Sequence, residues 1–273
     1  MAQTYIVTGA ASGIGRALCE RLLTDKGNQV CACDINYEAL TQIYANHKLA
    51  DAGGSLILQQ LDVRDVQQWQ EVVNTVIAQW QRIDVMCNIA GVLKDNWIAD
   101  IALPDDVDLH FDINVKGTIF GTQSVVDTMR NQGSGHIINV ASLAALSPVP
   151  GLSLYSASKY AVRAYSLAAG MELEKYGIAV TTLCPDAVQT PMLDQQKDKE
   201  QAALTFSGSR TLTVDEVVDA IVGPVLKKRP FEMVLPPSRG VVAKIANIFP
   251  QTTANFVDSF RKQGAKRQDK SKN

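Results

Sequence analysis

Tyr155 and Lys159 are the residues whose types and spacing point most directly to chemistry. Their separation of four positions places both side chains on one face of a helix. A free tyrosine has a pKa of about 10 and is a poor base at neutral pH, but a neighbouring ammonium group lowers that pKa. Ser142, at the end of an expected strand, would hydrogen-bond a substrate oxygen and stabilise its developing charge. The three residues predict acid–base chemistry at an alcohol or carbonyl oxygen.

Tyr-x-x-x-Lys pairs also occur on many solvated helices, where they have no chemical role. Here the residues that follow the tyrosine are small, in the order Ser156-Ala157-Ser158, and the pair comes after Ser142 in the chain. This setting favours a catalytic interpretation of Tyr155 and Lys159.

A glycine-rich turn near the start of the chain predicts a dinucleotide site. The turn follows an expected strand, opens an expected helix and reads Thr8-Gly9-Ala10-Ala11-Ser12-Gly13-Ile14-Gly15. Glycines let the backbone approach a pyrophosphate, and the amides and positive dipole of the helix N-terminus hold the anion. An ordinary tight turn is the alternative. The expected cofactor contacts of the turn are Gly9, Ser12, Gly13, Ile14 and Gly15.

Asp34 ends the next expected strand, at about the 20-residue offset where an acidic residue holds the adenosine ribose. A carboxylate at that place accepts hydrogen bonds from the ribose hydroxyls and repels a 2′-phosphate. Asp34 therefore predicts NAD rather than NADP as the cofactor. A solvated aspartate at a strand end is the alternative.

Seven short apolar segments alternate with helical patterns and must position these residues. Few polar residues interrupt the segments, as in a parallel sheet covered by helices on both faces. The expected strands are Tyr5–Thr8, Val30–Asp34, Leu56–Asp62, Ile83–Asn88, Gly135–Ser142, Ile178–Pro185 and Phe231–Leu235. Helical patterns cover Arg16–Thr24 and Gln67–Trp80, and a capping box spans Thr213–Glu216. The sequence predicts an α/β fold with a doubly wound, mostly parallel seven-stranded sheet.

The composition excludes several classes of protein. The chain of 273 residues is 46% hydrophobic and 20% charged, so it can bury a core and is not a disordered protein. The net charge of -2 argues against nucleic-acid binding, and neither a membrane-spanning run nor a signal peptide is expected. The five cysteines lack the spacing of metal ligands, so we expect free buried thiols, no metal and a cytoplasmic protein.

Taken in chain order, the motifs resemble those of the short-chain dehydrogenase/reductase family, in its compact single-domain branch. The resemblance extends to about residue 236 and implies a Rossmann-type fold, a nicotinamide cofactor and interconversion of an alcohol and a carbonyl. It rests on Gly9-x-x-x-Gly13-x-Gly15, Asp62-Val63, Asn88-Ile89-Ala90-Gly91, Asn114, Ser142, Tyr155-x-x-x-Lys159 and the segment from Pro185 to Thr190.

The resemblance also implies roles for individual residues. Asn114 would hold a water that links Lys159 to solvent, and Asp62 would contact the adenine. The implied cofactor contacts outside the glycine turn are Asp62, Val63, Asn88, Ala90, Gly91, Tyr155, Lys159, Pro185, Val188 and Thr190. Two positions depart from the family pattern: Ile89 replaces an asparagine, and Asp186 replaces a glycine that lets the backbone pass close to the nicotinamide.

The residues that flank the catalytic set are mostly apolar and include no basic residue. The candidate pocket residues are Leu93, Leu143, Leu146, Val149, Leu152, Met192 and Leu193. As a group they predict a hydrophobic secondary alcohol or ketone, or a lipid-like aldehyde, although core packing is the alternative for each one. The polar segment 186–212, called the substrate loop below, suits a mobile loop over the site.

Residues 1–236 would form a single catalytic domain, and residues 237–273 a helical C-terminal extension beyond the family core. Apolar residues recur in it at helical spacing, before a basic and frayed end that starts at Arg261. The extension could cover the substrate cleft, contact a sister subunit, or lie on a membrane surface as a peripheral contact. The two apolar stripes are Val241, Val242, Ile245 and Ile248, and then Phe256, Val257 and Phe260.

The leading prediction is an NAD-dependent alcohol dehydrogenase or carbonyl reductase for an apolar small molecule, with Tyr155 as the acid/base. Relatives of this kind are commonly homodimers or homotetramers. A non-catalytic dinucleotide-binding regulator, an NADP-dependent carbonyl reductase, and an epimerase or dehydratase that uses bound NAD transiently stay open as alternatives. The set of Asn114, Ser142, Tyr155 and Lys159 argues against the regulator, because a sensor needs no acid/base group.

Overall fold

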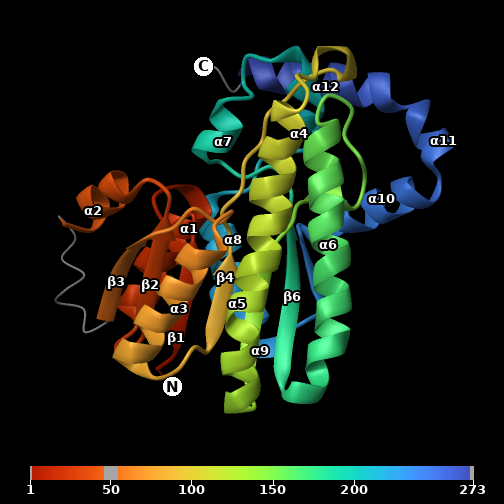
Figure 1. The fold of residues 1–273 in the computed structure, drawn as a ribbon. Helices are drawn as coiled ribbons and strands as arrows, with labels where there is room; N and C mark the ends of the chain where they lie inside the picture. The colour runs from red at the N-terminus through yellow and green to blue at the C-terminus, as the bar shows by residue number, and fades with distance from the viewer. Residues whose placement is uncertain (1, 46–54, 271–273) are drawn as a thin grey trace.

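The computed structural model describes residues 2–45 and 55–270. Its centre is a seven-stranded sheet in the order β3-β2-β1-β4-β5-β6-β7, with every neighbouring pair parallel (Figure 1). This confirms the expected doubly wound α/β fold. The strands are β1 (Thr4–Thr8), β2 (Gln29–Asp34), β3 (Ser55–Gln60), β4 (Val85–Asn88), β5 (Gly135–Val140), β6 (Ile178–Pro185) and β7 (Glu232–Leu235).

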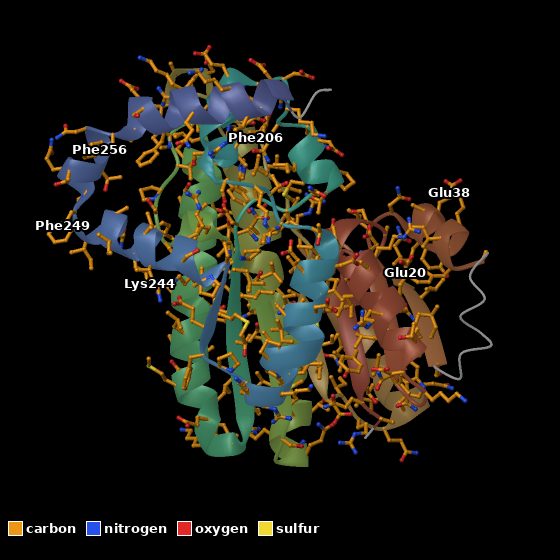
Figure 2. The ribbon with its side chains drawn as sticks, turned by 180° about the vertical axis from the view of Figure 1, so that it is seen from behind. Glu20, Glu38, Phe206, Lys244, Phe249 and Phe256 are labelled. Atoms are coloured by element: carbon orange, nitrogen blue, oxygen red, sulfur yellow. The ribbon has the colours of Figure 1, made fainter. Side chains whose placement is uncertain are left out.

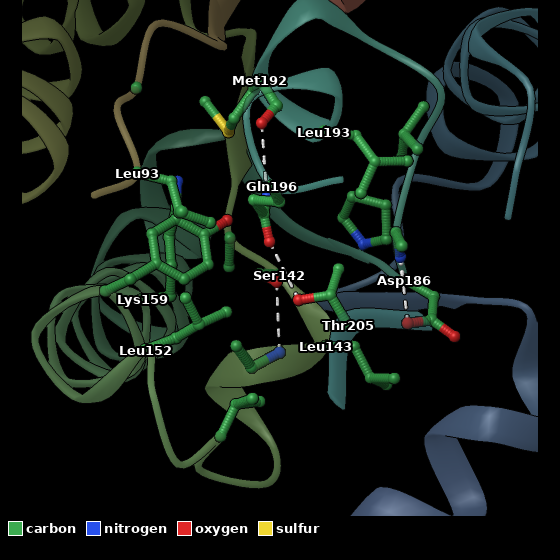
Figure 3. A pocket seen from close by; sticks show the side chains of 18 of the residues that line it. Leu93, Ser142, Leu143, Leu152, Lys159, Asp186, Met192, Leu193, Gln196 and Thr205 are labelled. Atoms are coloured by element: carbon green, nitrogen blue, oxygen red, sulfur yellow. Dashed lines mark hydrogen bonds between the residues drawn. The ribbon is translucent and has the colours of Figure 1, made fainter. Parts of the chain in front are cut away.

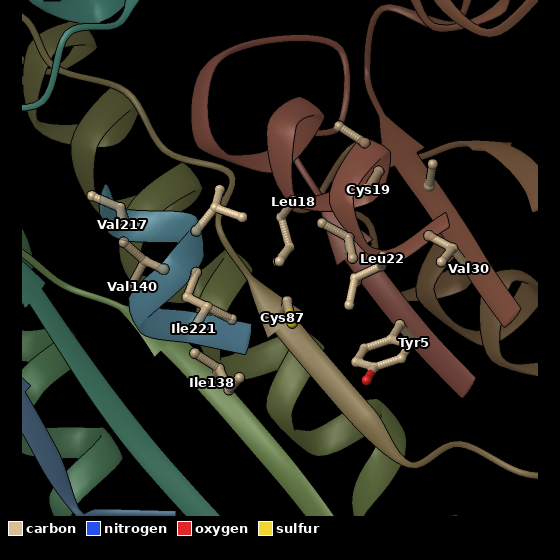
Figure 4. Packing of buried hydrophobic residues seen from close by; sticks show 14 of the residues in the cluster. Tyr5, Leu18, Cys19, Leu22, Val30, Cys87, Ile138, Val140, Val217 and Ile221 are labelled. Carbon is tan, nitrogen blue, oxygen red and sulfur yellow. The ribbon is translucent and has the colours of Figure 1, made fainter. Parts of the chain in front are cut away.

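Helices cover both faces of the sheet because side chains alternate between the faces along each strand. Tyr5 and Val7 of β1 pack in one cluster with α1 and α8 (Figure 4), whereas Ile6 packs in another with α3 and α5. The helices are α1 (Gly13–Thr24), α2 (Tyr37–Ala45), α3 (Val66–Trp80), α4 (Asp105–His110), α5 (Gly117–Gln132), α6 (Ser153–Leu173), α7 (Pro191–Asp194), α8 (Val214–Ala220), α9 (Leu226–Lys228), α10 (Pro237–Ile248), α11 (Pro250–Ala254) and α12 (Val257–Lys270). The capping box at the start of α8 is confirmed.

The strand order reverses at β1, since the chain first builds β2 and β3 on one side and later adds β4 on the other. In sheets of this kind, ligands bind outside the carboxyl ends of the strands next to the reversal. Gly9, Gly91, Ser142 and Asp186 follow the carboxyl ends of β1, β4, β5 and β6. The fold therefore gathers the expected motifs at one edge of the sheet.

The substrate loop is more regular than the sequence predicts. It contains the short helix α7 and a 3₁₀ segment at Glu200–Ser207. Lys199 forms an ion pair with the buried Asp95 (2.6 Å), and Val188 bridges to Leu212 across the ends of the loop. These contacts fix the loop over the carboxyl edge of the sheet.

Residues 261–270, where a frayed basic end is expected, belong to α12 in the structure. Arg267 donates hydrogen bonds to the carbonyl groups of Ser207 (2.7 Å) and Gly208 in the substrate loop. The basic residues therefore serve partly in tertiary contacts, which composition alone does not reveal. Residues 271–273 lie outside the described residues.

Candidate active site

A cavity of about 350 Å³ opens at the carboxyl edge of the sheet. Its volume lies in the range typical of small-molecule sites. The walls come from the glycine turn, the ends of β4, β5 and β6, the first turns of α6, the substrate loop and the C-terminal extension (Figure 3). Segments from both ends of the chain thus meet in one site.

Ser142, Tyr155 and Lys159 cluster in this cavity, at the end of β5. The Ser142 hydroxyl is hydrogen-bonded to the Tyr155 hydroxyl and also accepts from the Ala144 amide (3.1 Å). The Lys159 ammonium lies 5.8 Å from the centre of the Tyr155 ring and donates to the Val140 carbonyl (2.9 Å). This arrangement places a tyrosine hydroxyl and a serine hydroxyl in the wall of the same cavity.

Burial governs the ionisation of the pair. It raises the pKa of Tyr155, and the hydrogen bond from Ser142 offsets only part of that rise. Burial also lowers the pKa of Lys159 to about 8. Lys159 is not among the groups that shift this pKa in the structure, so its expected effect on Tyr155 stays a prediction. Tyr155 is therefore protonated at neutral pH.

The glycine turn fits the phosphates of a dinucleotide. Gly9 and Gly13 have φ angles of 70° and 50°, which side-chain-bearing residues rarely adopt. A Cβ at Gly15 would overlap the Gly9 carbonyl, so the turn closes tightly on the start of α1. The side chain of Ser12 does not cap α1, which leaves the first helical amides able to bind an anion.

Asp34 lies behind this turn rather than in the cavity wall. Its Oδ2 accepts a hydrogen bond from the Ala11 amide (2.9 Å), and its Oδ1 accepts one from the Asn36 amide (3.0 Å). The carboxylate is therefore fixed beside the glycine turn, where each oxygen keeps a further lone pair for a ribose hydroxyl.

Asn114 lies in a π-helical turn, Phe111–Lys116, outside the cavity wall. Its side-chain oxygen accepts a hydrogen bond from the Val92 amide, and its side-chain nitrogen donates to the Val92 carbonyl and the Ser158 hydroxyl. The backbone carbonyl of Asn114 accepts a hydrogen bond from the Thr118 hydroxyl (2.8 Å). A Cβ at Gly91 would lie 3.1 Å from Asn114 Oδ1 and 3.5 Å from Lys159 Nζ. Asn114 thus braces the segment beside the lysine.

Besides Asp34, three expected cofactor contacts lie outside the cavity wall. Asn88 is buried and donates to Asn139 (2.8 Å) between β4 and β5. Val63 packs against Gly117, and Asp62 forms a two-pronged ion pair with Arg64. The other expected residues line the cavity: Gly9, Ser12, Gly13, Ile14, Gly15, Ala90, Gly91, Pro185, Val188 and Thr190.

The expected substrate residues line the apolar half of the cavity, with one exception. Leu93, Leu143, Val149, Leu152, Met192 and Leu193 are all in its wall. Leu146 is not, because it is buried in a separate cluster with Val162 and Ala243. Apolar residue type alone does not reveal which leucine lines the cavity and which is buried in the core.

Sequence reasoning missed several wall residues. Arg239 of α10 lines the cavity and forms an ion pair with Asp186, which corrects the expectation of a pocket without basic residues. Gln196 and Thr205, joined by a hydrogen bond of 2.9 Å, add a polar spot from the substrate loop. The extension supplies a further set: Val242, Ala243, Ala246, Thr253, Val257 and Phe260. Its helical stripes were visible in the sequence, but not the face that meets the cavity.

Comparison with known proteins identifies the family. Residues 3–201 match the family model described as short chain dehydrogenase. The chain belongs to this family. The dehydrogenase is 34% identical over 210 residues to a cyclopentanol dehydrogenase of Comamonas sp. (strain NCIMB 9872), covering 77% of this chain and 82% of the relative. It is 35% identical over 208 residues to an (S)-acetoin-forming diacetyl reductase of Staphylococcus epidermidis (strain ATCC 12228 / FDA PCI 1200). The aligned part covers 76% of this chain and 79% of that relative.

Solved structures support the same fold. A short-chain dehydrogenase/reductase from Burkholderia phymatum in complex with NAD superposes with a TM-score of 0.81 at 23% identity, covering 92% of this chain and 95% of that one. The family match ends at residue 201, so the extension that lines the cavity of this dehydrogenase lies beyond it.

Proposed function

We propose that this short-chain dehydrogenase interconverts a hydrophobic secondary alcohol and its ketone, with NAD as the cofactor and Tyr155 as the acid/base. The observation that carries the proposal is the cluster of Tyr155, Ser142 and Lys159 in a cavity that continues from the glycine turn to an apolar wall. The family acts by oxidoreduction, and its named relatives act on secondary alcohols or the matching ketones.

A nicotinamide dinucleotide, when bound, supplies or accepts the hydride. The turn from Gly9 to Gly15 would hold its pyrophosphate with the amides that open α1. Val188 and Thr190, which both line the cavity, would hold the carboxamide, and Thr190 lies beside Gly13. Asp34 favours NAD over NADP because its fixed carboxylate would repel a 2′-phosphate.

Within the cavity, Ser142 orients the substrate oxygen and Tyr155 exchanges its proton. In the reducing direction the protonated Tyr155 donates to the forming alkoxide. Lys159 stands behind Tyr155 with a pKa of about 8, so it can return a proton near neutral pH. Asn114 positions the Gly91 and Val92 segment against Lys159.

The substrate class follows from the cavity wall. Leu93, Val149, Leu152 and Met192 surround the space in front of Tyr155 with apolar atoms, and Arg239 is neutralised by Asp186. A compact uncharged substrate is therefore favoured over a carboxylate or a phosphate. Five buried free cysteines support a cytoplasmic setting.

The test is NADH absorbance with a graded panel of secondary alcohols and ketones, using the native protein, Tyr155→Phe and the control Tyr165→Phe. We expect turnover of apolar substrates, a loss of about 100-fold or more in Tyr155→Phe, and nearly native activity in the control. NADH binding without turnover of any alcohol or ketone would instead indicate a dinucleotide-binding regulator.

A further inference from the structure

The C-terminal extension forms an arch whose outward side is unusually apolar. Ile248 is 68% exposed and Phe249 is 59% exposed, at the join of α10 and α11. Figure 2 shows Phe249 and Phe256 at the side of the molecule away from the strand edge formed by β3. The exposed large apolar side chains of the arch are Val241, Val242, Ile245, Ile248, Phe249, Phe256 and Phe260.

The apolar side of α10 is the one that the fold leaves uncovered. Val241, Ile245 and Ile248 follow one another at intervals of four and three residues, so they share one face of the helix. The other face is anchored: Ala243 is buried, and Asn247 accepts a hydrogen bond from the Tyr160 hydroxyl (2.8 Å). The orientation of the apolar face is therefore fixed by contacts of α10 with α6.

The exposed patch is continuous with the substrate cavity. Val242 and Phe260 are 56% and 44% exposed, yet both also line the cavity. They come from α10 and α12, the two limbs of the arch. An apolar molecule would thus meet apolar side chains from the outer surface to the catalytic tyrosine.

Exposed cationic side chains lie on α12, the second limb of the arch. Lys262 and Lys266 are exposed and one helical turn apart. Arg261 lies over the ring of Trp97, 5.1 Å from its centre, and its charge is paired with Asp258 (3.3 Å). Apolar side chains flanked by lysine and arginine are typical of helices that lie in the surface of an anionic membrane.

We propose that the outward face of the C-terminal extension binds an anionic lipid surface, and that the substrate enters from it between Val242 and Phe260. Among the described residues, no helix is both long and apolar enough to cross a membrane, which fits binding in the plane of the surface. A second copy of the chain on the same face would cover the cavity mouth. The entry route rests on the proposed function, whereas lipid binding does not.

Lipid binding is tested by co-sedimentation of the full chain with vesicles of phosphatidylcholine, alone and mixed with phosphatidylserine. We expect binding to the mixed vesicles, and at least about a tenfold loss in the double variant Ile248→Asp, Phe249→Asp. Met171→Asp is the matched control, because Met171 is 70% exposed on α6, outside the extension. NADH binding by both variants checks that they fold.

Two results would overturn lipid binding. One is a native protein that stays in the supernatant with both kinds of vesicle. The other is a double variant that sediments as the native protein does. Light scattering after gel filtration adds a third result. If the native protein is a dimer that does not bind vesicles, and the double variant is a monomer, then the patch is the contact with a second copy.

The entry route is tested with a long-chain secondary alcohol carried in the vesicles and with cyclopentanol in water. The double variant should lose about tenfold in turnover of the vesicle-borne alcohol and none with cyclopentanol. Equal rates of native protein and variant with the vesicle-borne alcohol would reject the route. Absence of turnover with either alcohol in the native protein would count against the proposed function, while the sedimentation result would stand.

Discussion

Asp186 Oδ2 and Arg239 Nε form an ion pair of 2.8 Å between the end of β6 and the first turn of α10. Asp186 occupies the position where the family pattern has glycine, and its Oδ1 also accepts from the Ala187 amide (2.9 Å). The side chains are 13% and 31% exposed, so the pair is partly shielded from water. A residue that departs from the family pattern thus fastens the extension to the cofactor side of the cavity.

Breaking this pair should loosen the cavity wall. We expect Arg239→Met and Asp186→Asn each to lower kcat/KM for a bulky alcohol by roughly tenfold, with a coupling energy of about 1 kcal/mol in the double variant. The cofactor dissociation constant should change less, because the hydrogen bonds of this pair go to each other and to Ala187 rather than to the glycine turn. Asp258→Asn, in the exposed pair with Arg261, is the control. Purely additive losses would show that the two side chains act separately.

The buried ammonium of Lys159 should give stability a specific pH dependence. Its pKa is lowered from the ordinary 10.5 to about 8, so the unfolded chain holds this proton more tightly than the folded protein. The charged Lys159 therefore lowers the free energy of unfolding, by its full amount below about pH 8. This loss of stability disappears as the pH rises to 10.5. Lys159→Met removes it, and should be more stable at neutral pH by up to about 3 kcal/mol.

Urea unfolding across this pH window measures the effect. The stability difference between Lys159→Met and the native protein should shrink as the pH rises, whereas Lys262→Met, at an exposed site on α12, should show no such trend. A difference that stays constant with pH would mean that the ammonium carries no burial penalty.

Asp34 should set the choice between NAD and NADP. Asp34→Ala is expected to lower the ratio of kcat/KM for NAD to that for NADP by roughly tenfold or more, because the repulsion of a 2′-phosphate is lost. Asp34→Asn keeps an oxygen acceptor for the Ala11 amide and so separates the charge from the bracing of the turn. A native preference for NADP would contradict this prediction.

Ala246 offers a way to test the part of the extension that lines the cavity. Ala246→Phe should fill space in front of α10 and lower kcat/KM for bulky alcohols by roughly tenfold, with a smaller effect on cyclopentanol. Ala254→Phe places the same side chain at an exposed position of α11, outside the cavity wall, and should leave both rates unchanged. Equal losses for all substrates would point to a general disturbance of the fold.

The sequence was most informative where local rules decide the structure. Short apolar strands such as β1 and β6, which alternate with helices along the chain, can be predicted from a few residues. The same is true of the glycines that open α1. The grouping of Ser142, Tyr155 and Lys159 was also predictable, because a short motif and a strand end place them together.

Tertiary contacts decided the rest. An apolar helical stripe predicts that a helix packs, but not that Val242 and Phe260 meet in one cavity. Leu146 and Leu143 are equally apolar and pack in the same cluster, but only Leu143 also lines the cavity. Likewise, the pKa of Tyr155 is raised because the fold buries this side chain. The presence of Lys159 four positions later does not reveal that burial.

The substrate loop and α12 touch backbone to backbone. A Cβ at Gly264 would overlap the Ala203 carbonyl, and the Gln268 side chain donates to the carbonyls of Gln196 (2.7 Å) and Lys199 (2.9 Å). The two segments therefore behave as one rigid flap, and neither can swing away without the other. We therefore expect that a partner or surface holding α12 from outside would slow the release of product without touching a reacting atom.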